Sequence, residues 1–145
     1  MTPTQIDALC KATDALYECD LAEGNCAVFA AALHLALGAD PTDTFLAVRE
    51  FQVGSRTVDS IVHIALQHKG EYYDSEGQTD PDTLLETWGE NIGDRFDPEY
   101  TYDLKMYSVR KASYLVNRTG ARTTMTDMVR SIQEAATRLG LKRCK

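Results

Sequence analysis

The sequence predicts an α+β fold in which a central, cysteine-bearing helix packs on an antiparallel sheet with flanking helices. Apolar residues recur with helical spacing before residue 38, alternate with polar residues over much of 44–109, and return to helical spacing after residue 124. Helices followed by strands and then a helix are typical of helices layered over an antiparallel sheet. With 145 residues, 43% of them hydrophobic, the chain is expected to form a single domain over 1–145.

Two helices are predicted in the first part of the chain. Residues 4–17 place one apolar stripe at helical spacing, formed by Ile6, Leu9, Cys10, Thr13, Leu16 and Tyr17. Asn25 is a suitable N-cap for a second helix over 26–37, which Gly38 ends. This second helix is apolar nearly all round, with His34 as its one polar side chain, so we expect it in the middle of the fold.

Strand patterns fill the middle of the chain. Period-two alternation and β-favouring residues predict strands over 44–53, 60–68, 71–74 and 100–109, with a short one over 113–116. A turn at Lys69-Gly70 joins the second of these strands to the third.

Two further helices follow from local signals. Pro81 favours the first turn of a short helix over 83–88. Residues 125–139 form an amphipathic helix, with Thr124 as its cap and Gly140 as its stop.

The sequence also leads to expectations about the cellular compartment and about cofactors. No apolar run is long enough to span a bilayer, and residues 1–5 lack the basic and apolar parts of a signal peptide, so we expect a cytoplasmic protein without membrane contact. The four cysteines contain no Cys-x-x-Cys pair, and no histidine pair has metal-binding spacing. We therefore expect neither a metal nor another cofactor.

Charge divides the chain unevenly. Residues 1–103 hold 5 Lys/Arg against 20 Asp/Glu, a balance of −15, while residues 104–145 hold 10 against 2, a balance of +8. Nucleic acid is not expected as the main partner, because phosphate binding needs clustered Lys and Arg. The two halves are expected to attract each other within one fold, although the basic end leaves a minor polyanion-binding surface open.

Three residues form a candidate catalytic site. Cys26 begins the central helix, where main-chain N–H groups and the helix dipole favour a thiolate and can hold an oxyanion. His63 lies in an otherwise apolar strand segment and needs a hydrogen-bond partner. Asp74 supplies one if the turn has two residues, because His63, Asp74 and Glu76 then share one face of the hairpin. A three-residue loop would turn Asp74 to the other face.

These residues resemble those of the papain-like and transglutaminase-like cysteine enzymes. The likeness covers about residues 20–80: Gly24-Asn25-Cys26 followed by the segment from Phe29 to Leu33, then His63-Ile64-Ala65-Leu66, then the segment from Gly70 to Gly77. It implies acyl transfer on an amide, isopeptide or thioester bond of a peptide or protein substrate, with Cys26 as nucleophile, His63 as proton shuttle and Asp74 as its orienting group. Asp20 stands near the place where papain-like proteases carry an oxyanion-binding glutamine, so the oxyanion-binding and support roles fall to Asn25, Glu76 or main-chain N–H groups.

Structural roles compete with this hypothesis. Cys26 could simply pack, His63 could bond a main-chain carbonyl, and Asp74 could serve a turn. His34 lies two helical turns from Cys26, His68 is expected to be exposed, and Trp88 with the tyrosines is expected at the core or rim. The second functional hypothesis is a catalytically silent protein of the same fold, a phage or bacterial inhibitor or adaptor that docks a basic partner on its acidic surface.

Overall fold

The computed structural model describes residues 1–16, 25–55, 57–90, 100–121 and 123–141. The described chain runs α1 (Pro3–Ala15), α2 (Cys26–Ala36), β1 (Thr44–Gln52), β2 (Val58–His68), β3 (Glu71–Asp74), β4 (Gly77–Thr79), α3 (Pro81–Leu85), β5 (Tyr100–Ser108), α4 (Ala112–Thr119) and α5 (Met125–Arg138). A π-helical turn, η1 (Glu86–Glu90), follows α3, and a 3₁₀ turn, η2 (Val109–Lys111), precedes α4.

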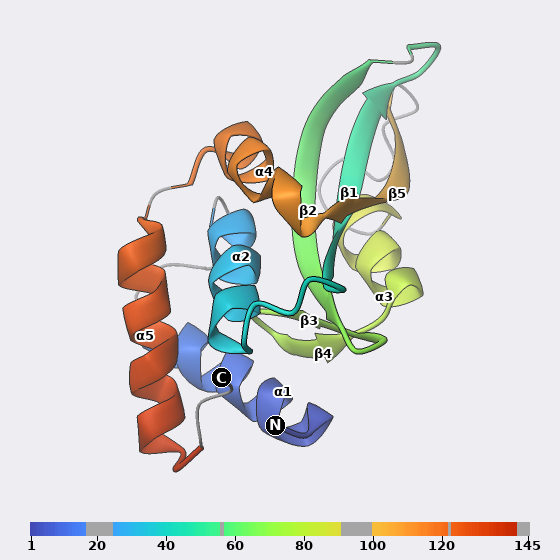
Figure 1. Ribbon diagram of the computed structural model, residues 1–145. Coiled ribbons are helices and arrows are strands. Elements are labelled where there is room, and N and C mark those ends of the chain that lie inside the picture. Colours follow the sequence, from blue (N-terminus) through green and yellow to red (C-terminus); the bar gives the residue numbers. More distant parts are fainter. Residues whose placement is uncertain (17–24, 56, 91–99, 122, 142–145) are drawn as a thin grey trace.

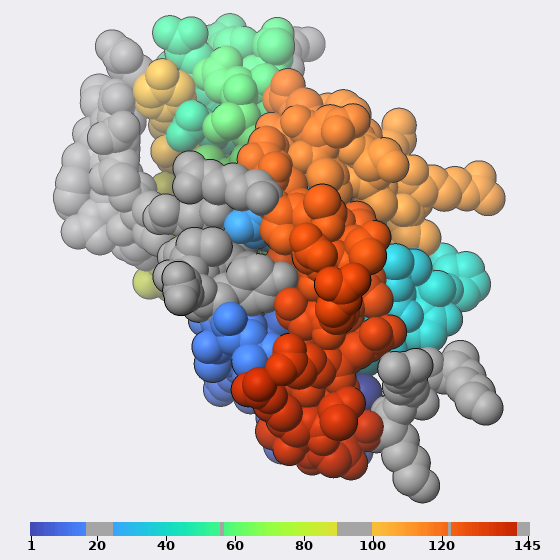
Figure 2. All heavy atoms as spheres, turned by 90° about the vertical axis from the view of Figure 1, so that its left-hand side faces the viewer, coloured from blue at the N-terminus to red at the C-terminus, as the bar shows by residue number. Residues whose placement is uncertain are grey.

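The five strands form one antiparallel sheet in the order β4-β3-β2-β1-β5. One face of the sheet packs against α1, α2 and α4, and α5 packs on α1 and α2, so that α2 lies between the sheet and α5 (Figure 1). Seen from the helical side, α5 lies across the front of this layer with α4 above it (Figure 2). The α+β class and the antiparallel sheet are therefore confirmed.

The central position of α2 follows from its composition. Every residue from Cys26 to Leu33 is buried, because the helix contacts β2 on one side and α4 and α5 on others. An all-apolar helix has no face suited to water, so this placement is the one its sequence favours. Gly38 follows its C-cap with a φ of 102°, as predicted.

A smaller core covers the opposite face of the sheet. Leu46, Val48 and Ala65 on that face pack against Leu84 of α3, with Trp88 and Tyr102 at the margin. The helix predicted over 83–88 is real but begins at Pro81 and changes to π-helical geometry at Glu86. Asp80 caps it by accepting a hydrogen bond from the Thr83 N–H.

Two sequence expectations fail elsewhere in the fold. Residues 113–116 are not a strand but lie inside α4, which buries Leu115 against the core and ends at Gly120 in the left-handed conformation. Burial of one stripe there overrides the local preference for strand. The three-residue strand β4 was missed, because so short a segment carries no readable alternation.

His68 was expected to be exposed, and this is wrong. It is 4% exposed, and its Nδ1 lies 2.8 Å from Oδ1 of Asp43, whose Oδ2 lies 2.8 Å from Nδ1 of His34. One buried carboxylate therefore links the end of β2, the start of β1 and α2. Hydrogen bonds to a shared acceptor make the burial of His68 and the partial burial of His34 tolerable.

The first helix, predicted over 4–17, is α1, capped by Thr2 through a reciprocal bond with Gln5, and Tyr17 lies outside the described residues. Also outside the described residues are Cys19, Asp20, Gly24 and Cys144. The final helix begins at its predicted cap, Thr124, which accepts from the Asp127 N–H. Among the described residues, no helix is long and apolar enough to cross a bilayer.

We predict that Asp43→Ala lowers the free energy of unfolding by about 2–4 kcal/mol, because the buried imidazole of His68 and the half-buried imidazole of His34 lose their acceptor. Urea denaturation followed by circular dichroism measures the change. The control is Glu134→Ala on the exposed face of α5, which removes one surface ion pair with Arg138. It should lower the free energy of unfolding by no more than about 0.5 kcal/mol. Equal stability losses in the two variants would contradict the structural role of Asp43.

Candidate active site

The β2–β3 hairpin brings His63 and Asp74 together. Its turn has two residues, Lys69 and Gly70, both with positive φ, and pairs His68 with Glu71. Two-residue turns of this kind match the twist of hairpin strands and fix their register. In that register, Nε2 of His63 lies 2.9 Å from Oδ2 of Asp74. The predicted diagonal contact is therefore present in the structure.

A bulge in β2 positions the imidazole. Val48 of β1 pairs with His63, but the next residue, Arg49, pairs with Ile61, so Val62 is an extra residue in β2. Bulges of this kind redirect neighbouring side chains. Pairing between β2 and β3 extends only to Leu66, and His63 lies beyond it. Trp88 stacks on the imidazole from the side of the sheet opposite α2, and Cys26 of α2 is near enough to raise the pKa of His63.

A tight turn that follows Asp74 fixes the orientation of its carboxylate. Asp74 pairs with Gly77, and its Oδ1 accepts a hydrogen bond of 2.9 Å from the Glu76 N–H. Glu76 was expected on the strand face beside His63; it lies instead in the turn, exposed, and supports the carboxylate through its main chain. Both oxygens of Asp74 thus have a partner, so the carboxylate holds one orientation.

Helix α1 buttresses the same turn. Oδ1 of Asp7 accepts a hydrogen bond of 2.7 Å from the Gln78 N–H. Gly77 has a φ of 115°, and a Cβ atom there would collide with the Asp7 carboxylate. The close packing of α1 on β4 therefore requires glycine at this position.

Cys26 is the first residue of α2, as predicted. The first bond within the helix runs from the Phe29 N–H to the Asn25 carbonyl, so the N–H groups of residues 26–28 have no partner inside the helix. Asn25 occupies the N-cap position, but its side chain makes no capping bond and accepts instead from the Thr123 N–H at 3.2 Å. Asn25 therefore ties the start of α2 to the segment before α5.

The electrostatics link His63 to both neighbours. Burial acts to lower the pKa of His63, but the hydrogen bond to the Asp74 carboxylate and the interactions with Cys26 outweigh it and raise that pKa to about 9. Nδ1, the ring nitrogen that does not contact Asp74, is buried and has no hydrogen-bond partner among the described residues. The imidazole is thus held through Nε2, while Nδ1 has no hydrogen-bond partner among the described residues.

Trp88 is a site residue that the sequence analysis placed only at the core or rim. Its indole ring stacks on the imidazole of His63, with the centroids 4.0 Å apart and the planes 11° from parallel. The stack fixes the plane of the imidazole and keeps water from one of its faces. An isolated tryptophan just after a short helix gives no sequence signal for such a contact.

Cys10 is a second free and buried thiol. Burial, together with the carboxylates of Asp74 and Asp7, raises the pKa of Cys10 well above its usual value. A thiol in such surroundings is inert. Cys10 therefore provides an internal standard for the reactivity of Cys26.

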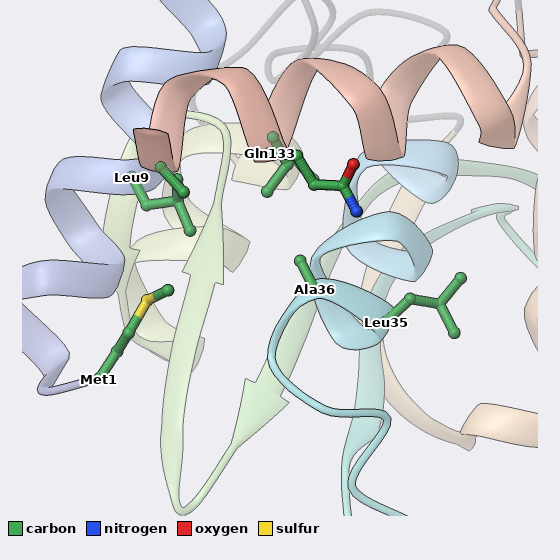
Figure 3. A pocket seen from close by; sticks show the side chains of 7 residues that line it. Met1, Leu9, Leu35, Ala36 and Gln133 are labelled. Carbon is green, nitrogen blue, oxygen red and sulfur yellow. The ribbon is translucent and has the colours of Figure 1, made fainter. Parts of the chain in front are cut away.

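One hollow of the molecule adjoins the candidate site, and another is separate from it. A polar hollow of about 150 Å³ lies beside Asp74 and Trp88. An apolar cavity of about 90 Å³ lies between α1, α2 and α5, lined by Met1, Leu9 and Leu35 among others (Figure 3). Leu35 is nine residues, or about 13 Å of helix, from Cys26, so the apolar cavity is separate from the candidate site.

Within the described ranges, one group of side chains has atoms of the types that bind metals. Donor atoms of Asp40, Asp43 and His68 lie within 4.8 Å of one another. Both oxygens of Asp43 already accept hydrogen bonds from imidazoles, and Oδ1 of Asp40 accepts two from Thr42. The cluster is satisfied by these bonds, and it lies at the other end of α2 from Cys26.

We predict that Gly77→Ala destabilises the protein by about 2 kcal/mol more than Gly54→Ala. Both glycines have positive φ, at 115° and 83°, so both variants carry backbone strain. Only at Gly77 does the added methyl group meet another side chain, whereas nothing lies within 4 Å at Gly54. Urea denaturation compares the two, and equal losses would show that α1 does not brace the Asp74 turn.

We also predict that His63 makes stability depend on pH. Its pKa is raised from 6.5 to about 9 in the folded protein, so its stabilising contribution is complete below pH 6.5 and is lost as the pH rises through 9. The free energy of unfolding should therefore fall across this window in the wild type and fall less in His63→Gln. Urea denaturation at half-unit pH steps measures both curves, and parallel curves would refute the linkage.

Comparison of the chain with protein-family models, with curated proteins and with solved structures gives no match. The functional argument therefore depends on the chemistry of Cys26, His63 and Asp74 alone.

Proposed function

We propose that the chain is a cysteine hydrolase or acyltransferase with a papain-like or transglutaminase-like core, acting on an amide, isopeptide or thioester bond of a peptide or protein. The observation that carries the proposal is the buried His63, bonded to Asp74 through Nε2 while Nδ1 has no hydrogen-bond partner among the described residues and Cys26 interacts with the ring. A nucleophile, a base and an orienting carboxylate in this order form a catalytic triad.

In the proposed reaction, His63 first accepts a proton from Cys26 and later donates it to the leaving group. His63 takes the proton of the Cys26 thiol, and Sγ attacks the substrate carbonyl carbon, forming a C–S bond and an oxyanion. When the oxyanion collapses, the C–N or C–S bond to the leaving group breaks and His63 returns the proton to it. Water or an acceptor amine then attacks the thioester by the same route, with His63 again as base.

The remaining residues take supporting roles. Main-chain N–H groups of residues 26–28 are suited to hold the oxyanion, because α2 does not use them. Asn25 fixes the start of α2 through Thr123, and Glu76 orients Asp74 through its N–H. Stacking on Trp88 preserves the ring plane during proton transfer. No step of this chemistry requires a cofactor.

Burial supports the alternative. Cys26, His63 and Asp74 are 4%, 1% and 3% exposed, so a substrate carbonyl must displace covering residues to reach Sγ. A protein that kept the core but lost catalysis would tolerate such burial. It would act as a binding protein, an inhibitor or adaptor, through the acidic surface of residues 1–103.

Alkylation by iodoacetamide, followed peptide by peptide with mass spectrometry, tests the proposal. Cys26 should react at pH 6.5 at least about tenfold faster in the wild type than in His63→Gln, because an imidazolium favours the thiolate. Cys10 should stay unmodified in both proteins, which shows that the fold is intact during labelling.

Two labelling results would contradict the proposal. If Cys26 reacts only in denaturant, together with Cys10, it is a packing residue and the binding function replaces the enzymatic one. If Cys26 reacts at the same rate in both proteins while Cys10 stays protected, the Cys26–His63 pair does not exist.

A further inference from the structure

A third hollow, of about 520 Å³, lies on the sheet at β1, β2 and β5 and is bounded on one side by η2 and α4. Its size is within the range of ligand-binding pockets. Figure 1 shows β5 at the end of the sheet, with the chain passing from it to α4. We call this hollow the β5 groove. It lies away from Cys26 and its partners, none of which lines it.

The β5 groove is cationic in a chain of net charge −7. Arg49, Lys105 and Lys111 line it, and none of its lining residues in the described chain is an aspartate or glutamate. Arg49 is paired with Asp103 through two hydrogen bonds of 2.7 and 2.8 Å. Lys105 and Lys111 form no ion pair within the described residues, so their charges face the hollow and the solvent.

Tyrosine rings hold the two lysines in place. The Lys105 ammonium lies 5.2 Å from the ring centre of Tyr107, and that of Lys111 lies 5.8 Å from the ring centre of Tyr114. The two rings are 6.3 Å apart. Cation–π contacts of this kind lower the freedom of the lysine side chains and so reduce the entropy lost on binding an anion.

The groove follows the edge of the sheet. Four successive residues of β5, from Lys105 to Ser108, line it. Successive side chains of a strand point to opposite faces, so one hollow meets all four only where it reaches the strand edge or backbone. The groove also extends over β1 and β2, at Arg49 and Val58, and within the described residues β5 pairs with β1 alone, which leaves the other edge of β5 without a strand. Met106 is 41% exposed there.

We propose that the β5 groove binds an extended, acidic peptide segment that pairs with the edge of β5. Backbone hydrogen bonds from the strand edge would supply affinity, and carboxylates at alternate positions would meet Lys105 and Lys111. The exposed side chains of Met106 and Tyr114 would cover the apolar residues between them.

A peptide fits the groove better than a nucleic acid does. The faces of Tyr107 and Tyr114 are covered by lysines, which leaves them poor platforms for stacked bases. A chain of net charge −7 repels a long polyanion more than it repels a short peptide. A strand edge also offers hydrogen bonds that an extended peptide backbone matches.

Fluorescence anisotropy with a fluorescein-labelled peptide of alternating glutamate and valine tests the proposal. We expect saturable binding that Lys105→Glu/Lys111→Glu weakens at least about tenfold, since two attractive charges become repulsive. The control, Arg130→Glu/Arg138→Glu, makes the same charge change on α5 and should keep the affinity within about twofold. All four residues are exposed, so the variants should fold.

Two further probes separate the possible ligands. The same peptide N-methylated at alternate residues should bind at least about tenfold more weakly, because it cannot pair with a strand edge. Single-stranded oligo(dT) should bind more weakly than the acidic peptide. Tighter binding of oligo(dT), equal loss in both double variants, or unchanged binding of the N-methylated peptide would each overturn the proposal.

Discussion

The hydrogen bond between His63 and Asp74 is the interaction on which the candidate site depends. A histidine on a buried strand must have a partner, and Asp74 supplies it only because a two-residue turn sets the register of β2 against β3. The bond ties up Nε2 and leaves Nδ1 for a second group. Helix α1 supports the arrangement at a distance, through the contact of Asp7 with the main chain of Gln78.

Strand β2 carries two buried histidines that differ in their hydrogen bonding. His68, near the turn, shares Asp43 with His34, so each oxygen of that carboxylate meets an imidazole and the cluster is closed. His63, at the bulge, has one nitrogen without a hydrogen-bond partner among the described residues and an aromatic ring against its face. Closed polar networks stabilise a fold, whereas an incomplete one in the core calls for a functional explanation. This contrast separates the candidate site from a purely structural histidine.

Much of this could be predicted from sequence because the signals are local. The apolar run from Cys26 predicted a buried helix, and a two-residue turn at Lys69-Gly70, one of two loop lengths considered, predicted the approach of His63 to Asp74. The rest depends on tertiary contacts. The stack of Trp88 on His63, the burial of His68 against Asp43 and the helical state of residues 113–116 each arise from packing between distant segments. Glu76 turned away because β3 ends at Asp74, which no alternation pattern revealed.

The central claim is that Asp74 and Cys26 act on His63 together, and ¹⁵N NMR of the His63 imidazole tests it most directly. We expect a pKa of about 9 in the wild type and a lower one in both Cys26→Ala and Asp74→Asn, since each substitution removes an interaction that raises it. A pKa at or below 6.5 in the wild type, or a value unchanged by Cys26→Ala, would show that no Cys–His pair exists and would contradict the account.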